Sequence, residues 1–366
     1  MIIQKLHLKN FRCFQDREFT FTSKFVVIQG DNGSGKSSLL EALHYSCYLR
    51  SFRTHLQRDL VAIGQDHFFT HVEFDQEITG THDHIQSGYS EREGKLVKFN
   101  QKPVQSYRDI ISSFRIVTLA ADDLALVHGA PECRRDFLNY SLFLLDPAII
   151  ATFKRHKQIV DHRNSLLSLF GQQGRQSYED EMLVWSEKLW AEALIIREAR
   201  RAYLAQIEGR VNDMLQGSFA SDVQDMRVSF TYEAKGVKGF ESFADFWQQF
   251  KQGGHQRELQ TGRTLFGAHL DDFLIVFQNK KARVFASRGQ QKLLVFLLKL
   301  AQLQLTNVGG EPGVLLLDDF MTDFDSSRLE RCISVINSMN FQIFITCPLK
   351  SGSLPAILHN FENISL

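Results

Sequence analysis

The sequence has no excess of charge of either sign. Lys and Arg together number 42 and Asp and Glu together number 42 among 366 residues, so the formal net charge is zero. This balance excludes an overall electrostatic field that would draw the protein to nucleic acid or to an anionic membrane. A positively charged surface for either partner must therefore be confined to part of the protein, or must form when several chains assemble.

Cysteine is scarce, and long apolar runs are missing. The five cysteines lie far apart and form no CxxC pair, which argues against a disulfide framework and against a structural zinc site. We therefore expect a cytoplasmic location. Apolar runs such as residues 293–298 fall short of the ~20 residues that a membrane span needs, and the first residues have no export signal. The sequence thus predicts no membrane association.

The composition is that of a globular protein. Hydrophobic residues make up 43% of the chain and charged residues 23%, which excludes global disorder. Residues 1–30 are predicted to form strands and include the apolar run 25–28, and a helix is expected to begin near Gly35. Short strand-like segments with polar turns follow between residues 69 and 99, which indicates an antiparallel β lobe.

The middle of the chain has a different pattern. Residues 122–218 follow helical spacing, broken by a loop at 171–174. One apolar stripe in this region is predicted to be core: Met182, Trp185, Leu189, Ala193 and Ile196. Residues 272–285 are expected to form a hairpin, and after Gly289 helices alternate with short buried strands. The prediction is an α/β domain made from both ends of the chain with a helical insertion: 1–121, 122–262 (the insertion) and 263–366.

A glycine-rich loop is the clearest motif. The residues from Gly30 to Ser37 fit G-x-x-x-x-G-K-[ST] between a predicted strand and a predicted helix, as a P-loop requires. Glycines let backbone N–H groups face a phosphate, and Lys36 supplies a charge to the outer phosphates. The expected ATP-binding residues are Gly30, Asp31, Asn32, Gly33, Ser34, Gly35, Lys36, Ser37 and Ser38. Ser37 is the expected Mg²⁺ ligand. The alternative to a P-loop is a glycine-rich turn with an exposed lysine and no nucleotide.

Two carboxylates follow a predicted buried strand far downstream. Asp318 and Asp319 come directly after residues 314–317, at the carboxyl end of that strand, where ligands bind in open α/β sheets. Asp318 can hold Mg²⁺ or its water, and Asp319 would then orient or deprotonate the attacking water. The alternative is an ordinary strand end with aspartates at the start of a turn. The presence of a P-loop in the same chain favours the catalytic interpretation of these two aspartates over the ordinary strand end.

A third motif opens a strongly apolar helix. It consists of Ser287, Arg288, Gly289 and Gln290. Ser287 fits an ordinary N-cap, but a hydroxyl and free N–H groups at a helix start also suit a phosphate. Both interpretations remain open from these residues alone.

The order of the motifs resembles that of ABC-type ATPases. Residues 287–290 resemble the ABC signature, and residues 322–325 resemble the D-loop, with Asp323 and Asp325. The whole chain is similar to the RecF family of bacterial recombination-repair ATPases, because residues 8–12 and 129–138 resemble segments found in that family. In this D-loop Asp323 and Phe324 replace the usual Glu and Leu, which puts details of a dimer interface in doubt.

This resemblance implies an ABC-type ATPase head, with a P-loop α/β core, an antiparallel β lobe and an inserted helical lobe. It implies ATP and Mg²⁺ as cofactors, and slow DNA-stimulated hydrolysis that depends on Lys36, Asp318, Asp319 and Ser287. ATP would drive formation of a homodimer in which Ser287 acts in trans. The family works in recombinational repair and replication-fork maintenance, on double-stranded DNA and ssDNA–dsDNA junctions, and assists RecO and RecR in loading RecA.

DNA contacts are expected from two local basic clusters, one after the first helix and one in the helical lobe. The candidates are Arg50, Arg53, Arg58, Lys154, Arg155, Lys157 and Arg163. Each cluster fits a solvated helix face equally well. Two other functions remain as alternatives, an SMC-like head ATPase and a non-hydrolysing DNA-binding scaffold with a P-loop. The insertion lacks the sustained heptads of an SMC arm, and the intact motifs argue against a scaffold.

Overall fold

The computed structural model describes residues 1–104, 114–170, 177–219, 226–236, 239–307, 312–322, 324–348, 358 and 360–366. Contacts within the chain divide it into two compact units. The first unit comprises residues 1–124, 213–226 and 286–366, and the second comprises residues 125–212 and 227–285. Both ends of the chain therefore belong to the first unit, as the sequence predicts for an α/β domain with an insertion.

The first unit contains a five-stranded parallel sheet. Its strand order is β14-β3-β13-β12-β8, and each strand runs parallel to its neighbours. The strands are β3 (Phe25–Gly30), β8 (Ile116–Leu119), β12 (Gly313–Leu317), β13 (Phe341–Pro348) and β14 (Glu362–Ser365). β8 and β12 are buried over their whole length, because a parallel sheet is covered on both faces. The short apolar runs of the sequence form this sheet.

The first unit also contains a six-stranded antiparallel sheet, ordered β2-β1-β4-β5-β6-β7. The strands are β1 (Ile2–Phe11), β2 (Phe14–Thr20), β4 (His67–Gln76), β5 (Thr81–Ser90), β6 (Gly94–Phe99) and β7 (Lys102–Pro103). Alternate side chains of a strand point to opposite faces. Accordingly, Phe68, Val72 and Phe74 of β4 are buried while His71 and Glu73 are half-buried. The predicted antiparallel β lobe is confirmed.

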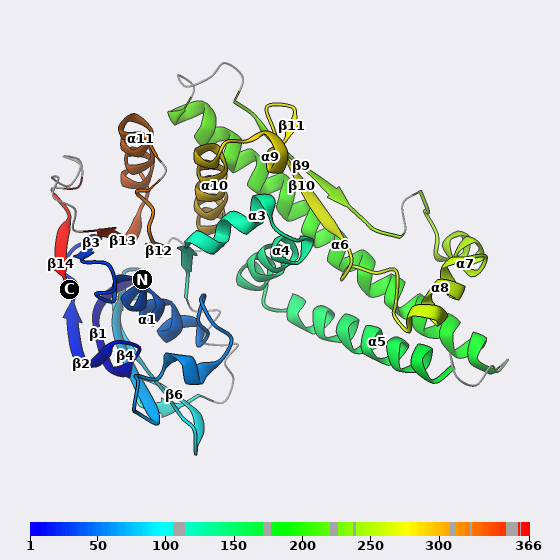
Figure 1. Ribbon diagram of the computed structural model, residues 1–366, viewed down its shortest axis with the longest axis horizontal. Helices are drawn as coiled ribbons and strands as arrows, with labels where there is room; N and C mark the ends of the chain where they lie inside the picture. Colours follow the sequence, from blue (N-terminus) through cyan, green and yellow to red (C-terminus); the bar gives the residue numbers. More distant parts are fainter. Residues whose placement is uncertain are drawn as a thin grey trace. The chain divides into compact units, whose positions relative to one another are not determined.

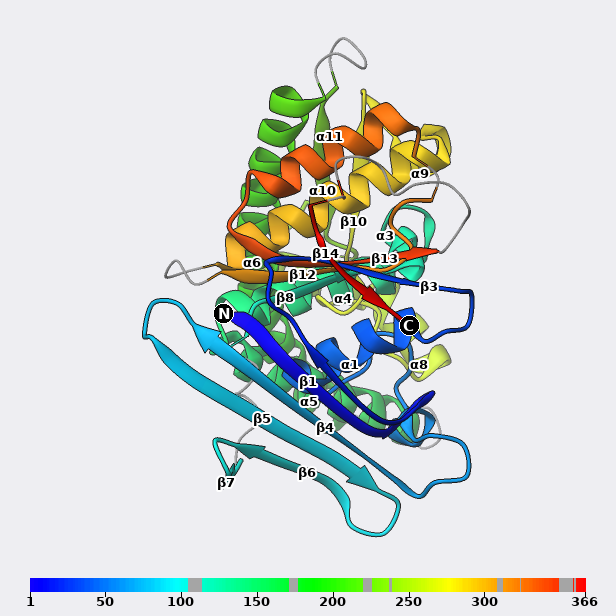
Figure 2. The ribbon, with the colours of Figure 1, turned by 90° about the vertical axis from the view of Figure 1, so that its left-hand side faces the viewer.

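One helix of the first unit lies between its two sheets. The helices are α1 (Lys36–Tyr48), α10 (Arg288–Thr306) and α11 (Ser326–Asn337), with the 3₁₀ turns η1 (Gln57–Leu60) and η2 (Ala121–Leu124). α1 contacts strands of both sheets (Figure 2), and ten of its 13 residues are buried. α10 packs on β8 and β12 and lies with α11 on the other side of the parallel sheet (Figure 2).

The second unit is mostly helical. Its helices are α3 (Ala125–His128), α4 (Pro131–Leu145), α5 (Ile149–Phe170), α6 (Ser177–Ser218, the last residues of which belong to the first unit), α7 (Phe243–Lys251), α8 (Gly254–Thr261) and α9 (Ala282–Phe285). A small antiparallel sheet, ordered β11-β10-β9, completes it: β9 (Val228–Glu233), β10 (Asp272–Phe277) and β11 (Lys280–Lys281). α5 runs beside α6 (Figure 1), and an apolar cluster that includes Ile159, Leu189 and Phe246 joins both helices to α7.

Several predicted elements are confirmed. α1 begins at Lys36, directly after Gly35, and the strand predicted at residues 314–317 is β12. The apolar stripe on α6 is core except for Trp185, which is only partly buried. The loop at 171–174 lies outside the described residues. No helix in the described parts of the chain is long and apolar enough to cross a membrane.

Two details differ from the sequence expectation. The hairpin predicted for residues 272–285 is wrong in its second half, because pairing with β10 ends at Lys281 and residues 282–285 form α9. The second unit extends to Phe285, beyond the expected boundary at 262. The reason is that β10 pairs with β9 along its whole length, which keeps both strands in one unit.

Candidate functional site

The glycine-rich loop joins the end of β3 to the start of α1, and two of its glycines are required by the backbone. Gly35 has a φ of 108°, which L-residues rarely adopt, and a Cβ there would lie 2.6 Å from Cys13 Sγ. A Cβ on Gly30 would overlap the hydroxyl of Ser34. Gly33, whose φ is 87°, is the second glycine that the backbone requires, whereas the neighbour of Gly30 is a serine hydroxyl that can rotate away.

The loop carries one cation and one buried hydroxyl. Lys36 Nζ donates hydrogen bonds to the carbonyl oxygens of Gly30 and Asp31, at 2.8 and 2.7 Å. Ser34 Oγ is buried and has no hydrogen-bond partner within the described residues. An ammonium that donates to the loop's own carbonyl oxygens and a hydroxyl without a partner are groups that phosphate oxygens can satisfy.

The strand order brings the second motif to the loop. β13 lies between β3 and β12, so the carboxyl ends of these strands meet at one edge of the sheet. Ser37 Oγ donates to Asp318 Oδ1 at 2.9 Å although the two residues are 281 positions apart. Thr346 Oγ1, from β13, donates to the same carboxylate oxygen at 3.0 Å. Burial raises the pKa of Asp318, against the effect of these two hydrogen bonds.

Hydrogen bonds with two other residues hold the backbone of Asp319, and its side chain is exposed. Its φ of 49° lies in the left-handed region. Its N–H donates to Thr346 Oγ1 at 2.8 Å, and its carbonyl oxygen accepts from Lys292 Nζ at 2.9 Å. The sequence places Thr346 where transporter ATPases carry a histidine that contacts the γ-phosphate, whereas Lys292 has no role predicted from the sequence, because its partners are distant along the chain.

Ser287 caps α10. Gln290 N donates to Ser287 Oγ at 3.3 Å, and Ser287 N donates to Gln290 Oε1 at 2.8 Å, which makes a reciprocal capping box. The N-cap alternative of the sequence analysis is therefore present in the structure. Arg288 lines a small pocket together with Asp318 and Asp319. The first turn of α10 thus borders the two carboxylates of the same unit.

Asp325, from the segment that resembles a D-loop, has a local structural role. Its side chain is the N-cap of α11 and accepts a hydrogen bond from Arg328 N at 2.8 Å. Asp323 lies outside the described residues.

A buried carboxylate that the sequence analysis did not identify lies on α1. Glu41 is fully buried, and its two oxygens accept hydrogen bonds at 2.8 Å each from Nη2 and Nε of Arg12. Arg53 Nη1 also donates to it, at 3.3 Å, and the charge of Arg53 opposes the upward shift of the Asp318 pKa. Arg53 therefore pairs with a buried carboxylate, and its contact with DNA stays a prediction.

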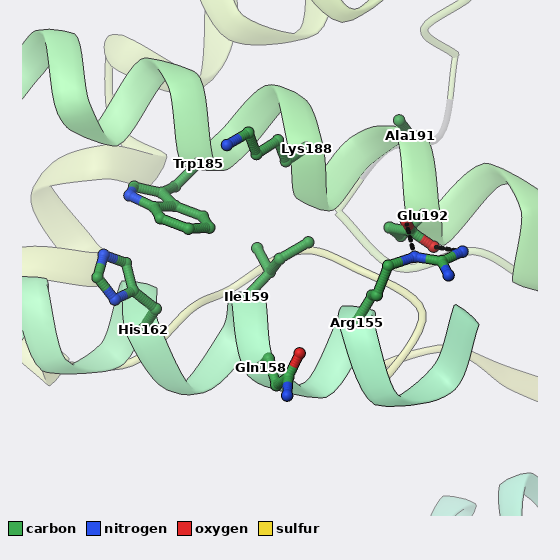
Figure 3. A pocket seen from close by; sticks show the side chains of 8 residues that line it. All are labelled: Arg155, Gln158, Ile159, His162, Trp185, Lys188, Ala191 and Glu192. Atoms are coloured by element: carbon green, nitrogen blue, oxygen red, sulfur yellow. Dashed lines mark hydrogen bonds and ion pairs between the residues drawn. The ribbon is translucent and has the colours of Figure 1, made fainter. Parts of the chain in front are cut away.

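The other expected DNA contacts have different surroundings. Arg50 and Arg58 after α1, and Lys154 and Lys157 on α5, are exposed. Arg155 pairs with Glu192, with 2.7 Å between Nε and Oε1, beside a pocket between α5 and α6 that Trp185 also lines (Figure 3).

The expectation for Arg163 requires correction. Its side chain is fully buried and pairs with the equally buried Glu258, with 2.8 Å between Nη2 and Oε2. A guanidinium with no solvent exposure cannot reach a DNA phosphate, so Arg163 is a core ion pair.

The parallel sheet, the P-loop and the two aspartates after β12 define an ABC-type ATPase head. The family model for the RecF/RecN/SMC N-terminal domain matches residues 2–356. DNA replication and repair protein RecF of a Geobacter species is 30% identical over 94% of this chain and 93% of its own length. RecF of Chloroherpeton thalassium is 31% identical, with 94% of each chain covered. The chain belongs to the RecF/RecN/SMC N-terminal domain family and, within it, to the RecF proteins.

Solved structures agree with this assignment. The structure of a recombination mediator protein, RecF-ATP in the RecFOR pathway, matches with a TM-score of 0.82 at 26% identity, covering 96% of this chain and 93% of that one. The Smc head domain of Pyrococcus furiosus matches with a TM-score of 0.55 at 15% identity, covering 95% and 89%. The Smc similarity shows the shared fold alone.

Proposed function

We propose that this chain binds and slowly hydrolyses ATP with Mg²⁺ during recombinational repair and replication-fork maintenance. The observation that carries the proposal is the hydrogen bond between Ser37 Oγ and Asp318 Oδ1, because it joins two nucleotide-binding motifs across 281 positions of the chain. The matching RecF-ATP structure gives independent support for the choice of nucleotide.

The residues at the loop fit a nucleotide and its metal. Backbone N–H groups from Gly30 to Ser38 would bind phosphate oxygens, and the buried Ser34 hydroxyl would gain the partner that it lacks. Lys36 would exchange its two carbonyl partners for phosphate oxygens. Ser37 and Asp318 offer two hard oxygen ligands for Mg²⁺, which when bound neutralises the charge that develops on the phosphates.

Asp319 is the group that we assign to the attacking water. Its carboxylate is exposed at the end of β12, next to the proposed metal ligand Asp318. A carboxylate there can orient a water molecule or accept its proton. Because its backbone is held on both sides, the side chain starts from a fixed position.

Ser287 would act on the nucleotide of a second protomer. Its oxygen accepts from Gln290 N, and no acceptor for its hydroxyl proton is present in the described part of the chain. That proton is available for a γ-phosphate oxygen, and removing one such preorganised donor typically costs about 10²–10³ in rate. ATP-dependent homodimerisation follows, since each nucleotide would bind to both chains.

We also propose that the dimer binds double-stranded DNA and ssDNA–dsDNA junctions, and assists RecO and RecR in loading RecA. With zero net charge, the exposed Arg50, Arg58, Lys154 and Lys157 would contact phosphates without reading bases. Binding should therefore weaken steeply with salt. The name of the matching RecF structure, which refers to the RecFOR pathway, supports the choice of partners.

The test is the molecular mass in solution of the wild type and of Lys36→Met, with and without ATP·Mg²⁺ and duplex DNA. We expect ATP to double the mass of the wild type only. Ser287→Arg should bind ATP and remain monomeric. A wild type that binds ATP but stays monomeric would contradict the shared-site proposal, and ATP binding without turnover would favour a non-hydrolysing scaffold.

A further inference from the structure

A buried lysine connects the helix that begins at Ser287 to the loop that carries Asp319. Lys292 lies on α10, and only 6% of it is exposed. Its Nζ donates to the carbonyl oxygen of Asp319 at 2.9 Å, to Thr322 Oγ1 at 2.8 Å and to the carbonyl oxygen of Thr322. An ammonium group can donate several hydrogen bonds, and three oxygens that accept from this one belong to one short loop.

The same loop contains an unusual backbone conformation. The φ of 49° at Asp319 is uncommon for a residue with a side chain and persists where surrounding groups impose it. Thr346 Oγ1 accepts from the Asp319 N–H and Lys292 Nζ donates to the Asp319 carbonyl. Thr322 Oγ1 also donates to that carbonyl, at 3.0 Å. Thr346 on β13 therefore holds the N–H of Asp319, and Lys292 on α10 holds its carbonyl oxygen.

We propose that Lys292 is a positioning residue that makes the direction of the Asp319 carboxylate depend on the position of α10. This inference rests on the proposed hydrolysis of ATP. Ser287 at the start of α10 is assigned to the partner's nucleotide, whereas Asp319 acts on the nucleotide of its own chain. In the proposed homodimer Lys292 would couple the two nucleotide sites, because a shift of α10 on engaging one nucleotide would move the group that hydrolyses the other.

The direct test compares Lys292→Met, which fills a similar volume without donors, with Lys292→Arg, which keeps a charge and donors. Lys299→Met is the matched control, since Lys299 lies on the same helix and pairs with Asp123 at 2.7 Å. A displacement near 1 Å costs about 10²-fold in rate, so we expect Lys292→Met to lower kcat by about that factor. KM for ATP and the ATP-dependent mass should not change. Lys292→Arg should recover part of kcat, and Lys299→Met should match the wild type.

A second measurement does not depend on turnover. Amide hydrogen exchange of residues 317–322 reports how firmly the Asp319 backbone is held. We expect Lys292→Met and Thr322→Val to speed this exchange at least about tenfold while Lys299→Met leaves it unchanged. Thr322→Val removes the hydroxyl that accepts from Lys292 and donates to the Asp319 carbonyl oxygen. It therefore provides the test if Lys292→Met fails to fold.

The outcomes separate this inference from the proposed function. Wild-type exchange at residues 317–322 in Lys292→Met and Thr322→Val would overturn the positioning role, whether or not the protein hydrolyses ATP. Faster exchange with an unchanged kcat would also overturn it. A wild type without hydrolysis refutes the proposed ATPase, and the exchange experiment then still decides whether Lys292 holds Asp319.

Discussion

Lowering the pH from 7 to 5 should destabilise the second unit. His156 and His269 stay neutral in the folded protein over this range, whereas in the unfolded chain they take up protons. His156 is 5% exposed, and burial lowers its pKa to about 3, with the charge of His269 contributing. Burial likewise lowers the pKa of His269 to about 4. The two ring centroids lie 5.5 Å apart. Asp271 acts against both shifts, and four arginines add to them: Arg197 and Arg200 for His156, Arg135 and Arg163 for His269.

The sign and size follow from proton linkage. An unfolded histidine has a pKa of about 6.5 and takes up a proton as the pH falls through that value. The folded forms of His156 and His269 do not, so folding stability decreases below pH 6.5 and the loss levels off near pH 4 and pH 3. Each pH unit in that window costs about 1.4 kcal/mol per histidine. From pH 7 to pH 5 each histidine costs about 2 kcal/mol, or about 4 kcal/mol for both.

Tryptophan fluorescence during urea unfolding measures this effect in the correct unit. The sequence contains three tryptophans, and all lie in the second unit: Trp185, Trp190 and Trp247. His156→Leu removes one titrating group, so the stability difference between pH 7 and pH 5 should fall by about half. An equal pH dependence in the wild type and in this variant would refute the linkage argument.

Three further substitutions have defined outcomes. Gly35→Ala should weaken ATP binding in a nucleotide titration, because it places a Cβ against Cys13 at a φ of 108°; unchanged affinity would show that the loop relaxes. Glu258→Gln leaves the Arg163 guanidinium buried without its counter-charge, and should cost about 3–5 kcal/mol in urea unfolding; a cost below 1 kcal/mol would contradict that burial. Asp319→Asn should keep ATP binding and slow single-turnover hydrolysis about 10²–10⁴-fold, whereas full activity would exclude Asp319 as the group that activates water.

The parts of the site that lie at strand ends were predictable from the sequence. Buried apolar runs before Gly30 and before Asp318 both predict strands of one parallel sheet. Parallel strands place their carboxyl ends at one edge, so the two motifs were expected to meet. The 2.9 Å hydrogen bond between Ser37 and Asp318 confirms that geometry. The roles of these residues with nucleotide and metal remain predictions.

Buried charge was the hardest feature to predict. Arg163 was assigned to DNA because it belongs to a basic cluster in the helical lobe, yet it follows the buried Ile159 by four positions and precedes the buried Leu167 by four. Helical periodicity thus places it on the apolar face of α5. Its partner Glu258 is 95 positions away, so only the tertiary structure reveals the pair. Glu41 and Lys292 were missed for the same reason.

The distribution of tryptophan makes the two units separately observable. Every P-loop residue and both aspartates after β12 belong to the first unit, whereas all three tryptophans belong to the second. A nucleotide bound at the P-loop has no tryptophan within its own unit to quench or shift. An ATP-induced change in tryptophan fluorescence would therefore originate in the helical unit of the same chain or in assembly with a second protomer, and its absence in Lys36→Met would assign the cause to the P-loop.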